Sequence, residues 1–178
     1  YDIDTVSGGG ITEGTVGTHT FTINVNDTPT LDFQAASDSV TEGVGANIDI
    51  ILELSNPAST PVTFTYNDDG TGSATVSDDY TDPSGAQTIA AGLTLHTVNV
   101  SITNDDVYEP DEDVDFSISG VNAAATISGQ TTFNLTIQDE QSYPELYFQS
   151  ATSSLSETVT TRTHVVEMSV SSQENVIF

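Results

Sequence analysis

The chain has 178 residues, enough for one or two domains, and it is strongly acidic: 27 Asp and Glu stand against one basic residue, and the formal net charge is -26. With Arg162 alone available to neutralise phosphates, a nucleic-acid partner is excluded, and so is direct binding to an anionic membrane surface. The chain has no cysteine, which excludes disulfides and thiolate metal sites. No apolar stretch approaches the roughly 20 residues of a membrane span, so we expect no membrane insertion.

Apolar residues recur at every second position, which is the pattern of strands with one buried face. In chain order, the strands predicted from this alternation lie at 31–33, 48–54, 62–66, 98–102, 114–118 and 133–137. Clusters of Asn, Asp, Pro and Gly between them predict turns, and no stretch has a helical period. About seven short strands with such turns predict an all-β fold, an immunoglobulin-like antiparallel β-sandwich.

The chain also repeats itself. Residues 31–42 return as 146–157, a shift of 115, and residues 20–27 return as 132–139, a shift of 112. A period of about 113 residues is the length of one sandwich domain. We therefore predict tandem repeats: 1–29 as the C-terminal part of a preceding repeat, 30–141 as a complete repeat, and 142–178 as the N-terminal part of a following one.

Acidic residues gather in the loops of the central repeat. Ten of them lie in four short segments: Glu42, 78–79, 105–112 and 139–140. In a seven-stranded sandwich the first segment follows the first strand and the last follows the last strand, so all four can meet at one pole. Five carboxylates between positions 105 and 112 would repel one another strongly, and a hard cation with six to eight oxygen ligands relieves that repulsion. The pattern favours Ca²⁺ over Mg²⁺, which prefers to keep its waters.

Five segments of the central repeat resemble the Calx-beta domain, a repeat of sodium-calcium exchangers, an integrin and large bacterial surface proteins. They are Ser39–Gly43, Ser77–Tyr80 with Gly85, Ala91–Gly92, Ile102–Asp113 and Thr136–Glu140, in the family's order and spacing. The resemblance covers the whole central repeat, and both flanking pieces match the corresponding ends of the family.

The resemblance implies which residues bind calcium. The implied ligands are Glu42, Asp79, Asp105, Glu109, Glu112 and Asp139, with the backbone carbonyl of Val107. Asp27 would belong to the site of the preceding repeat and Glu157 to that of the following one. Two departures, Asn104 in place of an acid and the closing run Asp139–Gln141 in place of three aspartates, imply fewer or weaker ions than in the fullest members of the family.

These observations predict a calcium-binding structural segment of a large extracellular or cell-surface protein, a calcium-stiffened rod in an adhesin or filament. Its partners would be neighbouring repeats of the same chain and, in a fibre, identical subunits that exchange strands. One alternative is a calcium-sensing regulatory domain of a larger membrane or enzyme assembly. A second is an acidic surface that serves solubility alone. No catalytic triad or carboxylate pair in a defined cleft can be argued, so we predict that the chain is not an enzyme.

Overall fold

The structure is a computed structural model that describes residue 20 and residues 27–177. Its strands are β1 Thr30–Phe33, β2 Ser37–Thr41, β3 Asn47–Leu54, β4 Val62–Asp68, β5 Gly85–Ile89, β6 Leu95–Ser101, β7 Val107–Tyr108, β8 Glu112–Ser119, β9 Thr126–Ile127, β10 Thr132–Gln138, β11 Leu146–Phe148, β12 Val166–Met168 and β13 Ser171–Ser172. All secondary structure in these residues is strand, and a helix able to cross a membrane is absent from them. The all-β prediction is confirmed.

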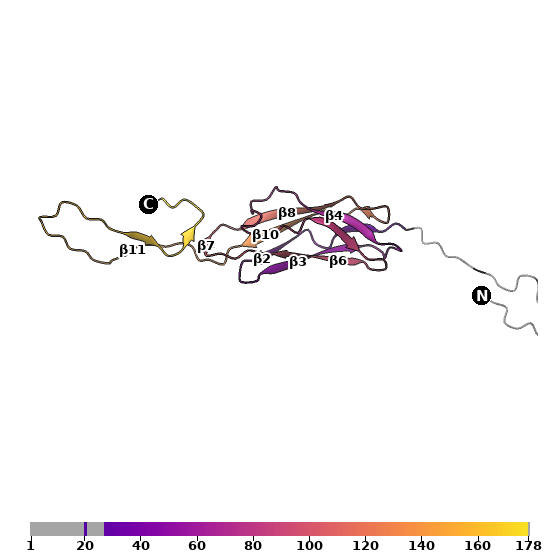
Figure 1. The fold of residues 1–178 in the computed structure, drawn as a ribbon, viewed down its shortest axis with the longest axis horizontal. Coiled ribbons are helices and arrows are strands. Elements are labelled where there is room, and N and C mark those ends of the chain that lie inside the picture. The colour runs from indigo at the N-terminus through magenta and orange to yellow at the C-terminus, as the bar shows by residue number, and fades with distance from the viewer. Residues whose placement is uncertain (1–19, 21–26, 178) are drawn as a thin grey trace, which may run out of the picture.

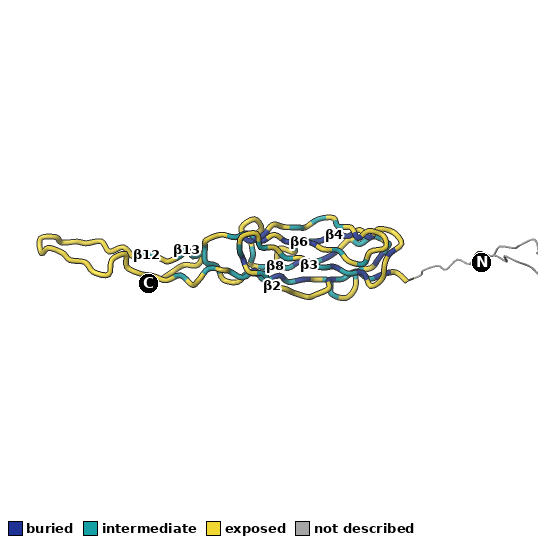
Figure 2. Tube along the Cα trace, turned by 90° about the horizontal axis from the view of Figure 1, so that it is seen from below, coloured by how far each residue is buried: buried dark blue, intermediate teal, exposed yellow. Residues whose placement is uncertain are grey.

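Two sheets pack face to face and form the body of the molecule (Figure 1). One sheet has the order β6-β3-β1-β9, and the other has the order β2-β10-β8-β4-β5. Buried positions alternate along the strands, as in β10, where Phe133, Leu135 and Ile137 point into the core. The buried residues run through the body, whereas the C-terminal extension is mostly exposed (Figure 2). The predicted sandwich is therefore confirmed.

The first strand of the sandwich divides between the two sheets. β1 pairs antiparallel with β3, and after a short bend the chain crosses to the other sheet, where β2 pairs with β10 in parallel. β1 also pairs in parallel with β9. The sandwich thus has nine strands, where the sequence predicted about seven, and two of its edge pairs are parallel in an otherwise antiparallel arrangement.

An aromatic group fills the core beside the acidic loops. Phe116 is fully buried, with its ring centroid 5.1 Å from that of Tyr66 and 6.2 Å from that of Tyr80. The excursion between β4 and β5 that carries Tyr80 packs tightly on β8: a Cβ added at Gly72 would lie 1.9 Å from the carbonyl oxygen of Asp113. Only glycine fits there, and this close approach holds the excursion against the sheet.

Residues beyond the sandwich form a narrow extension. β11 and β12 pair as an antiparallel hairpin, and β13 returns to pair in parallel with β7, which lies in the loop between β6 and β8. The side chains of Tyr143 and Tyr108 pack against each other at this junction, with ring centroids 4.8 Å apart and the ring planes tilted by 43°. Because residues 1–19 and 21–26 lie outside the described part, the predicted division of the chain into three units stays a prediction.

Candidate metal centre

Parallel pairing of β2 with β10 brings two predicted ligands together. Thr41 lies opposite Gln138, and the next residues in the two strands are Glu42 and Asp139. The N–H of Glu42 donates to the carbonyl of Gln138 at 2.8 Å, which extends the ladder to the site. The Asp139 carboxylate accepts hydrogen bonds from the N–H groups of Glu109 and Gln141, both at 2.8 Å. These contacts fix the Asp139 side chain at the end of the sheet.

Asp79 is held by a tight turn in the excursion between β4 and β5. Its N–H donates to the carbonyl of Thr75 at 3.0 Å, and its carboxylate accepts the N–H of Thr75. Its carbonyl accepts the N–H of Thr103 at 2.8 Å. Ser77 turns the chain with a φ of 76°, a left-handed conformation that is strained for a residue with a Cβ. The result is an Asp79 side chain only 4 % exposed.

The loop between β6 and β8 supplies the remaining predicted ligands. Asp105 accepts the N–H of Val107 at 2.7 Å and so shapes the start of the loop. Glu109 is half-buried, and Glu112 begins β8 opposite Ile137 of β10. The short strand β7 lies between Asp105 and Glu109 and pairs with β13. The same loop therefore carries predicted ligands and the strand that contacts the extension.

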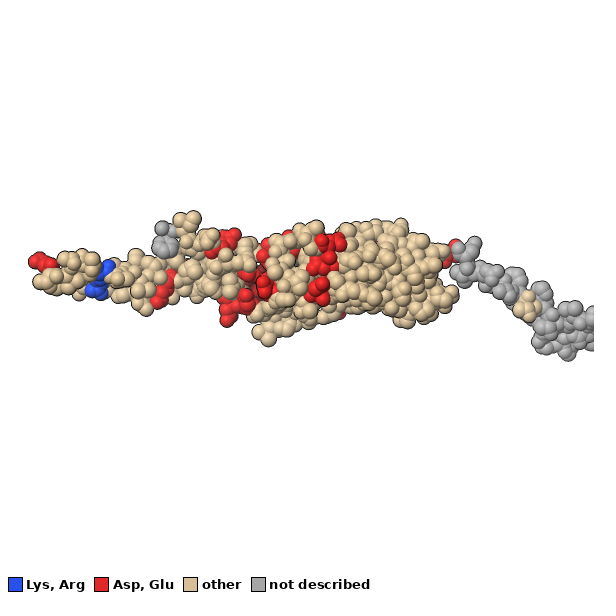
Figure 3. Space-filling view, turned by 45° about the horizontal axis from the view of Figure 1, so that its top comes forward, with Lys and Arg blue, Asp and Glu red and all other residues tan. Residues whose placement is uncertain are grey.

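Carboxylates from all four acidic segments meet at one pole. Oxygens of Glu42, Asp79 and Glu109 lie within 4.8 Å of one another, as do oxygens of Glu42, Asp139 and Glu140. Glu42 is 9 % exposed. Two unit charges at that separation repel each other by roughly 3 kcal/mol at an effective dielectric constant of about 20. Acidic side chains are visible where the body meets the extension, and the opposite half of the body is largely free of them in this view (Figure 3).

Burial and crowding shift the acidity of three of these groups. Burial, reinforced by the charges of Glu140 and Glu109, raises the pKa of Glu42 to about 7. Burial and the charge of Asp79 raise the pKa of Glu109 to about 7. Burial and a hydrogen bond shared with Asp79 raise the pKa of Glu112 to about 8. Without a cation, the pole therefore holds protons near neutral pH.

The donor set fits a hard cation. Every side-chain donor at the pole is an oxygen, which is what Ca²⁺ and Mg²⁺ require. Two buried oxygens, Oε2 of Glu112 and Oε1 of Gln141, have no hydrogen-bond partner among the described residues. Buried polar atoms nearly always have a partner, and an unpartnered carboxylate oxygen beside other carboxylates is what a cation would satisfy.

Raising the pH from 5 to 8 is expected to destabilise the cation-free protein. The folded-state pKa values of Glu42, Glu109 and Glu112 lie above the usual glutamate value of 4.5, so across this range the folded state holds more protons than the unfolded state and loses stability as they leave. Thermal unfolding in chelator across this pH range measures the effect. Glu112→Gln should reduce the slope, whereas the exposed Asp49→Asn should leave it unchanged. A melting temperature in chelator that rises steadily from pH 5 to 8 would contradict the assignment.

The structure brings most of the predicted site residues together at this pole. Those gathered there are Glu42, Asp79, Asp105, Val107, Glu109, Glu112 and Asp139. Asp27 lies at the opposite pole and Glu157 in the exposed loop between β11 and β12, so neither joins the cluster. Whether each residue binds an ion stays a prediction.

Two residues at the pole were not among the predicted ligands. Glu140 shares the second carboxylate group with Glu42 and Asp139. Gln141 donates from Nε2 to the carbonyl of Asp105 at 2.6 Å and leaves its Oε1 unpartnered. The signal in the sequence was their place in the closing run Asp139–Gln141, whose departure from three aspartates implied fewer or weaker ions.

Comparison with known proteins agrees with this geometry. The sequence profile of the Calx-beta domain matches residues 24–141. Among solved structures, the chain is similar to CBD12 from CALX1.2 (TM-score 0.57, 18 % identity, 62 % of this chain and 44 % of that chain). It is also similar to the calcium binding domain CBD12 of CALX1.1, with a TM-score of 0.56, 19 % identity, and coverage of 61 % of this chain and 44 % of that chain. The apo-form Calx CBD1 domain is similar too, with a TM-score of 0.55, 19 % identity, and coverage of 65 % of this chain and 100 % of that chain.

These likenesses differ in what they establish. The chain covers less than half the length of either CBD12 structure, and at these identities the structural likeness shows the fold. A comparison with curated protein sequences finds no match. The family profile, by contrast, matches well over half of the chain, across every strand from β1 to β10. The chain belongs to the Calx-beta family.

Proposed function

We propose that this chain is a calcium-binding structural segment of a large extracellular or cell-surface protein, a rod that calcium stiffens. The observation that carries the proposal is the position of the carboxylate cluster: it lies at the pole where the chain leaves the sandwich for the next unit. The loop 105–112 supplies predicted ligands and also pairs with β13 of the extension. An ion that orders this loop would therefore also order the junction.

The residues that would hold calcium are Glu42, Asp79, Asp105, Glu109, Glu112 and Asp139, with Glu140 and the carbonyl of Val107 beside them. Bound calcium supplies positive charge that offsets the mutual repulsion of these groups. The residues themselves come from four separate segments of the chain, so a ligand that binds them only in the folded arrangement stabilises the whole sandwich by mass action. The stabilisation is about 2.7 kcal/mol when calcium is a hundredfold above its dissociation constant.

Thermal unfolding across a calcium titration tests the proposal. The melting temperature should rise with calcium, return to its starting value in excess chelator, and rise less with magnesium. The double variant Glu109→Ala and Glu112→Ala should lose the response. A melting temperature indifferent to calcium would sink the proposal and leave an acidic sandwich whose charge serves solubility.

The dissociation constant separates the structural role from a sensor. The closing run ends in Gln141, a neutral ligand type, which favours modest affinity and so an environment rich in calcium. A constant between tenths of a millimolar and a few millimolar suits an extracellular module, whereas a micromolar constant suits a regulatory sensor. Isothermal titration calorimetry on the chain at physiological salt gives this value directly.

A further inference from the structure

The extension repeats the β1–β3 strand pair of the sandwich in three dimensions. β11 pairs with β12 in the register in which β1 pairs with β3, and the matched pairs are Leu31↔Leu54 with Leu146↔Met168, Asp32↔Glu53 with Tyr147↔Glu167, and Phe33↔Leu52 with Phe148↔Val166. The backbone bond from Ser55 to Thr30 is matched by the bond from Ser169 to Glu145, both 2.9 Å. Hydroxyls of the same two serines accept the return bonds, at 3.0 and 2.9 Å. The two strand pairs are thus equivalent, with a shift of 114 residues between β3 and β12.

This equivalence identifies what docks on the acidic pole. With the same shift, Ser171–Gln173 corresponds to Pro57–Ser59 in the loop between β3 and β4. In the structure, Ser171 and Ser172 pair with Val107 and Tyr108, and the N–H of Gln173 donates to the carbonyl of Tyr108 at 3.0 Å. The loop after the second strand of one unit therefore pairs with the ligand-bearing loop of the unit before it.

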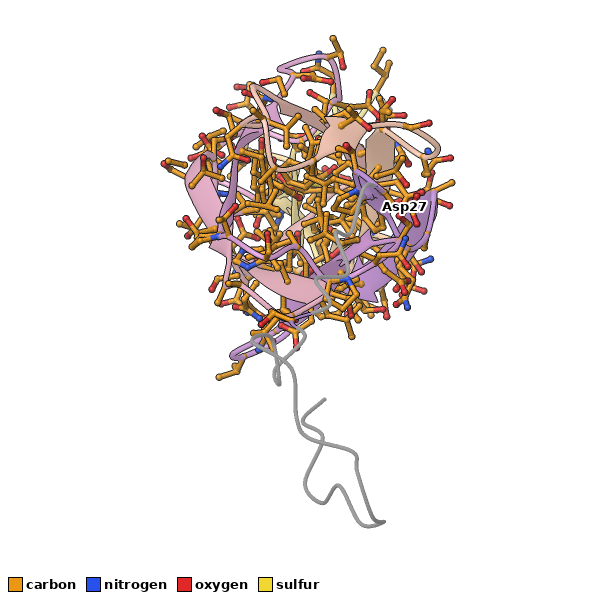
Figure 4. The ribbon with its side chains drawn as sticks, turned by 90° about the vertical axis from the view of Figure 1, so that its right-hand side faces the viewer. Asp27 is labelled. Carbon is orange, nitrogen blue, oxygen red and sulfur yellow. The ribbon has the colours of Figure 1, made fainter. Side chains whose placement is uncertain are left out.

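The corresponding loop of the sandwich itself lies open at the opposite pole. Pro57–Thr60 lines a hollow of about 410 Å³ together with 27–29 and 123–124. Asp27 stands at its rim, and Figure 4 looks onto this pole with Asp27 labelled. The N–H of Ser59, the counterpart of the Gln173 donor, has no acceptor among the described residues. The surface thus has the same free donor that the extension uses, and space beside it.

Sequence and charge both indicate what fills the hollow. Asp27 is the counterpart of Asp139, so the end of a preceding acidic pole is covalently placed at this rim. Asp27 precedes Leu31 by four positions, whereas Asp139 precedes Leu146 by seven. The shorter connection holds the preceding unit closer to the sandwich than the sandwich is held to the extension. Apart from Asp27, the lining residues are uncharged: Thr28, Pro29, Pro57, Ala58, Ser59, Thr60, Ala123 and Ala124. An acidic loop can therefore approach without meeting a second group of carboxylates.

We propose that the Pro57–Thr60 loop is the docking surface for the acidic loop of a preceding Calx-beta domain, the counterpart of Asp105–Glu112. The contact repeats the β7–β13 pairing: the Ser59 N–H donates to a backbone carbonyl of that loop, and the carbonyl of Pro57 remains free to accept. This proposal rests on the proposed function only in taking the chain as one of several consecutive repeats. Its geometry does not depend on calcium being bound.

Disulfide trapping tests the contact, since the chain has no cysteine of its own. Val107→Cys with Ser171→Cys in the chain as it stands tests the observed pairing. The proposed pairing is tested in a two-repeat protein in which Asp139 of one copy is followed directly by Thr28 of a second, which reproduces the natural Asp27–Thr28 connection. It carries Val107→Cys in the first copy and Pro57→Cys in the second. The control pairs Val107→Cys of the first copy with Val44→Cys of the second. The Val44 side chain is 99 % exposed and lies on the turn between β2 and β3, at the acidic pole of the second copy and away from the proposed contact.

The expected result is that the 107–57 disulfide closes at a rate close to that of the 107–171 disulfide. It should close on the order of tenfold faster than the 107–44 control. The control still reacts slowly, because two thiols in one chain meet by chance even where the structure does not hold them together. Closure no faster than in the control, or failure of the 107–171 pair itself, would overturn the proposal. The calcium dependence of the melting temperature, measured on the same proteins, reports separately on the proposed function: a docked pair with no calcium response would refute only that function.

Discussion

Replacing Asp79 by Asn is expected to weaken calcium binding by about a hundredfold, since charge count sets the affinity of such sites. The same change should raise the free energy of unfolding in chelator at pH 8. Asp79 is the most buried of the clustered acids, and its oxygens lie within 4.8 Å of those of Glu42 and Glu109. Without calcium its charge adds to the repulsion, and with calcium the same charge is a ligand. Asn keeps an oxygen to accept the Thr75 N–H, so the turn is preserved.

The neighbouring Asp78→Asn is the matched control, because Asp78 is exposed and its replacement removes the same formal charge. It should leave the dissociation constant within about twofold, as expected for an exposed charge outside the cluster. Calorimetry gives the affinities, and urea unfolding in chelator gives the stabilities. If Asp79→Asn destabilised the protein in chelator while binding calcium normally, Asp79 would be a structural residue of the turn and not a ligand.

Phe116→Ala is expected to lower the free energy of unfolding by about 3–5 kcal/mol, the usual cost of removing a fully buried aromatic ring. Phe116 packs between Tyr66 and Tyr80, which lie on two different segments, so neither can close the cavity without moving its own backbone. Tyr80 follows Asp79 directly, and its hydroxyl donates to Asp68. Loss of the ring beneath Tyr80 should therefore also loosen Asp79 and lower calcium affinity.

Phe148→Ala is the control for this prediction. Phe148 lies on β11 with its side chain 65 % exposed, so the same truncation removes little buried area. Its effect on the unfolding of the sandwich should stay within about 0.5 kcal/mol. Urea unfolding in saturating calcium measures both variants. A loss below 1 kcal/mol for Phe116→Ala would mean that the aromatic group does not organise the core.

The alternation of apolar residues was sufficient to predict most of the sandwich. The strands expected at 48–54, 114–118 and 133–137 are β3, β8 and β10, and their inward residues are the buried ones. The gathering of acidic loops at one pole was also predictable, because it requires only that the first and last strands end at the same edge. This reasoning accounts for the meeting of Glu42, Asp79, Glu109, Asp139 and Glu140. The choice of ligands, Val107 included, was implied only by the resemblance to the Calx-beta domain.

Pairing partners were beyond the reach of the sequence. A period of two shows which face of a strand is buried but not which strand lies beside it. The sequence therefore predicts a single first strand before Glu42, whereas the structure has two strands there, β1 and β2, in different sheets. The match between β3 and β12 was hidden because residues at equivalent pairing positions differ in identity, as Leu52 of β3 and Val166 of β12 do. Gln141 was misjudged because its amide oxygen becomes significant only once it is known to be buried without a donor.

The parallel pairing of β2 with β10 governs how the domain responds to tension. β2 lies near the point where the chain enters the sandwich and β10 ends where it leaves, and five residue pairs join them. Pulling on the two chain ends drives these strands in opposite directions along their common axis. All five pairs are then loaded together, in shear, and must fail together. In an antiparallel terminal pair, the hydrogen bonds would instead break one after another from one end. The resistance of this domain to force thus resides in a ladder that ends, at Glu42 and Asp139, in the acidic pole itself.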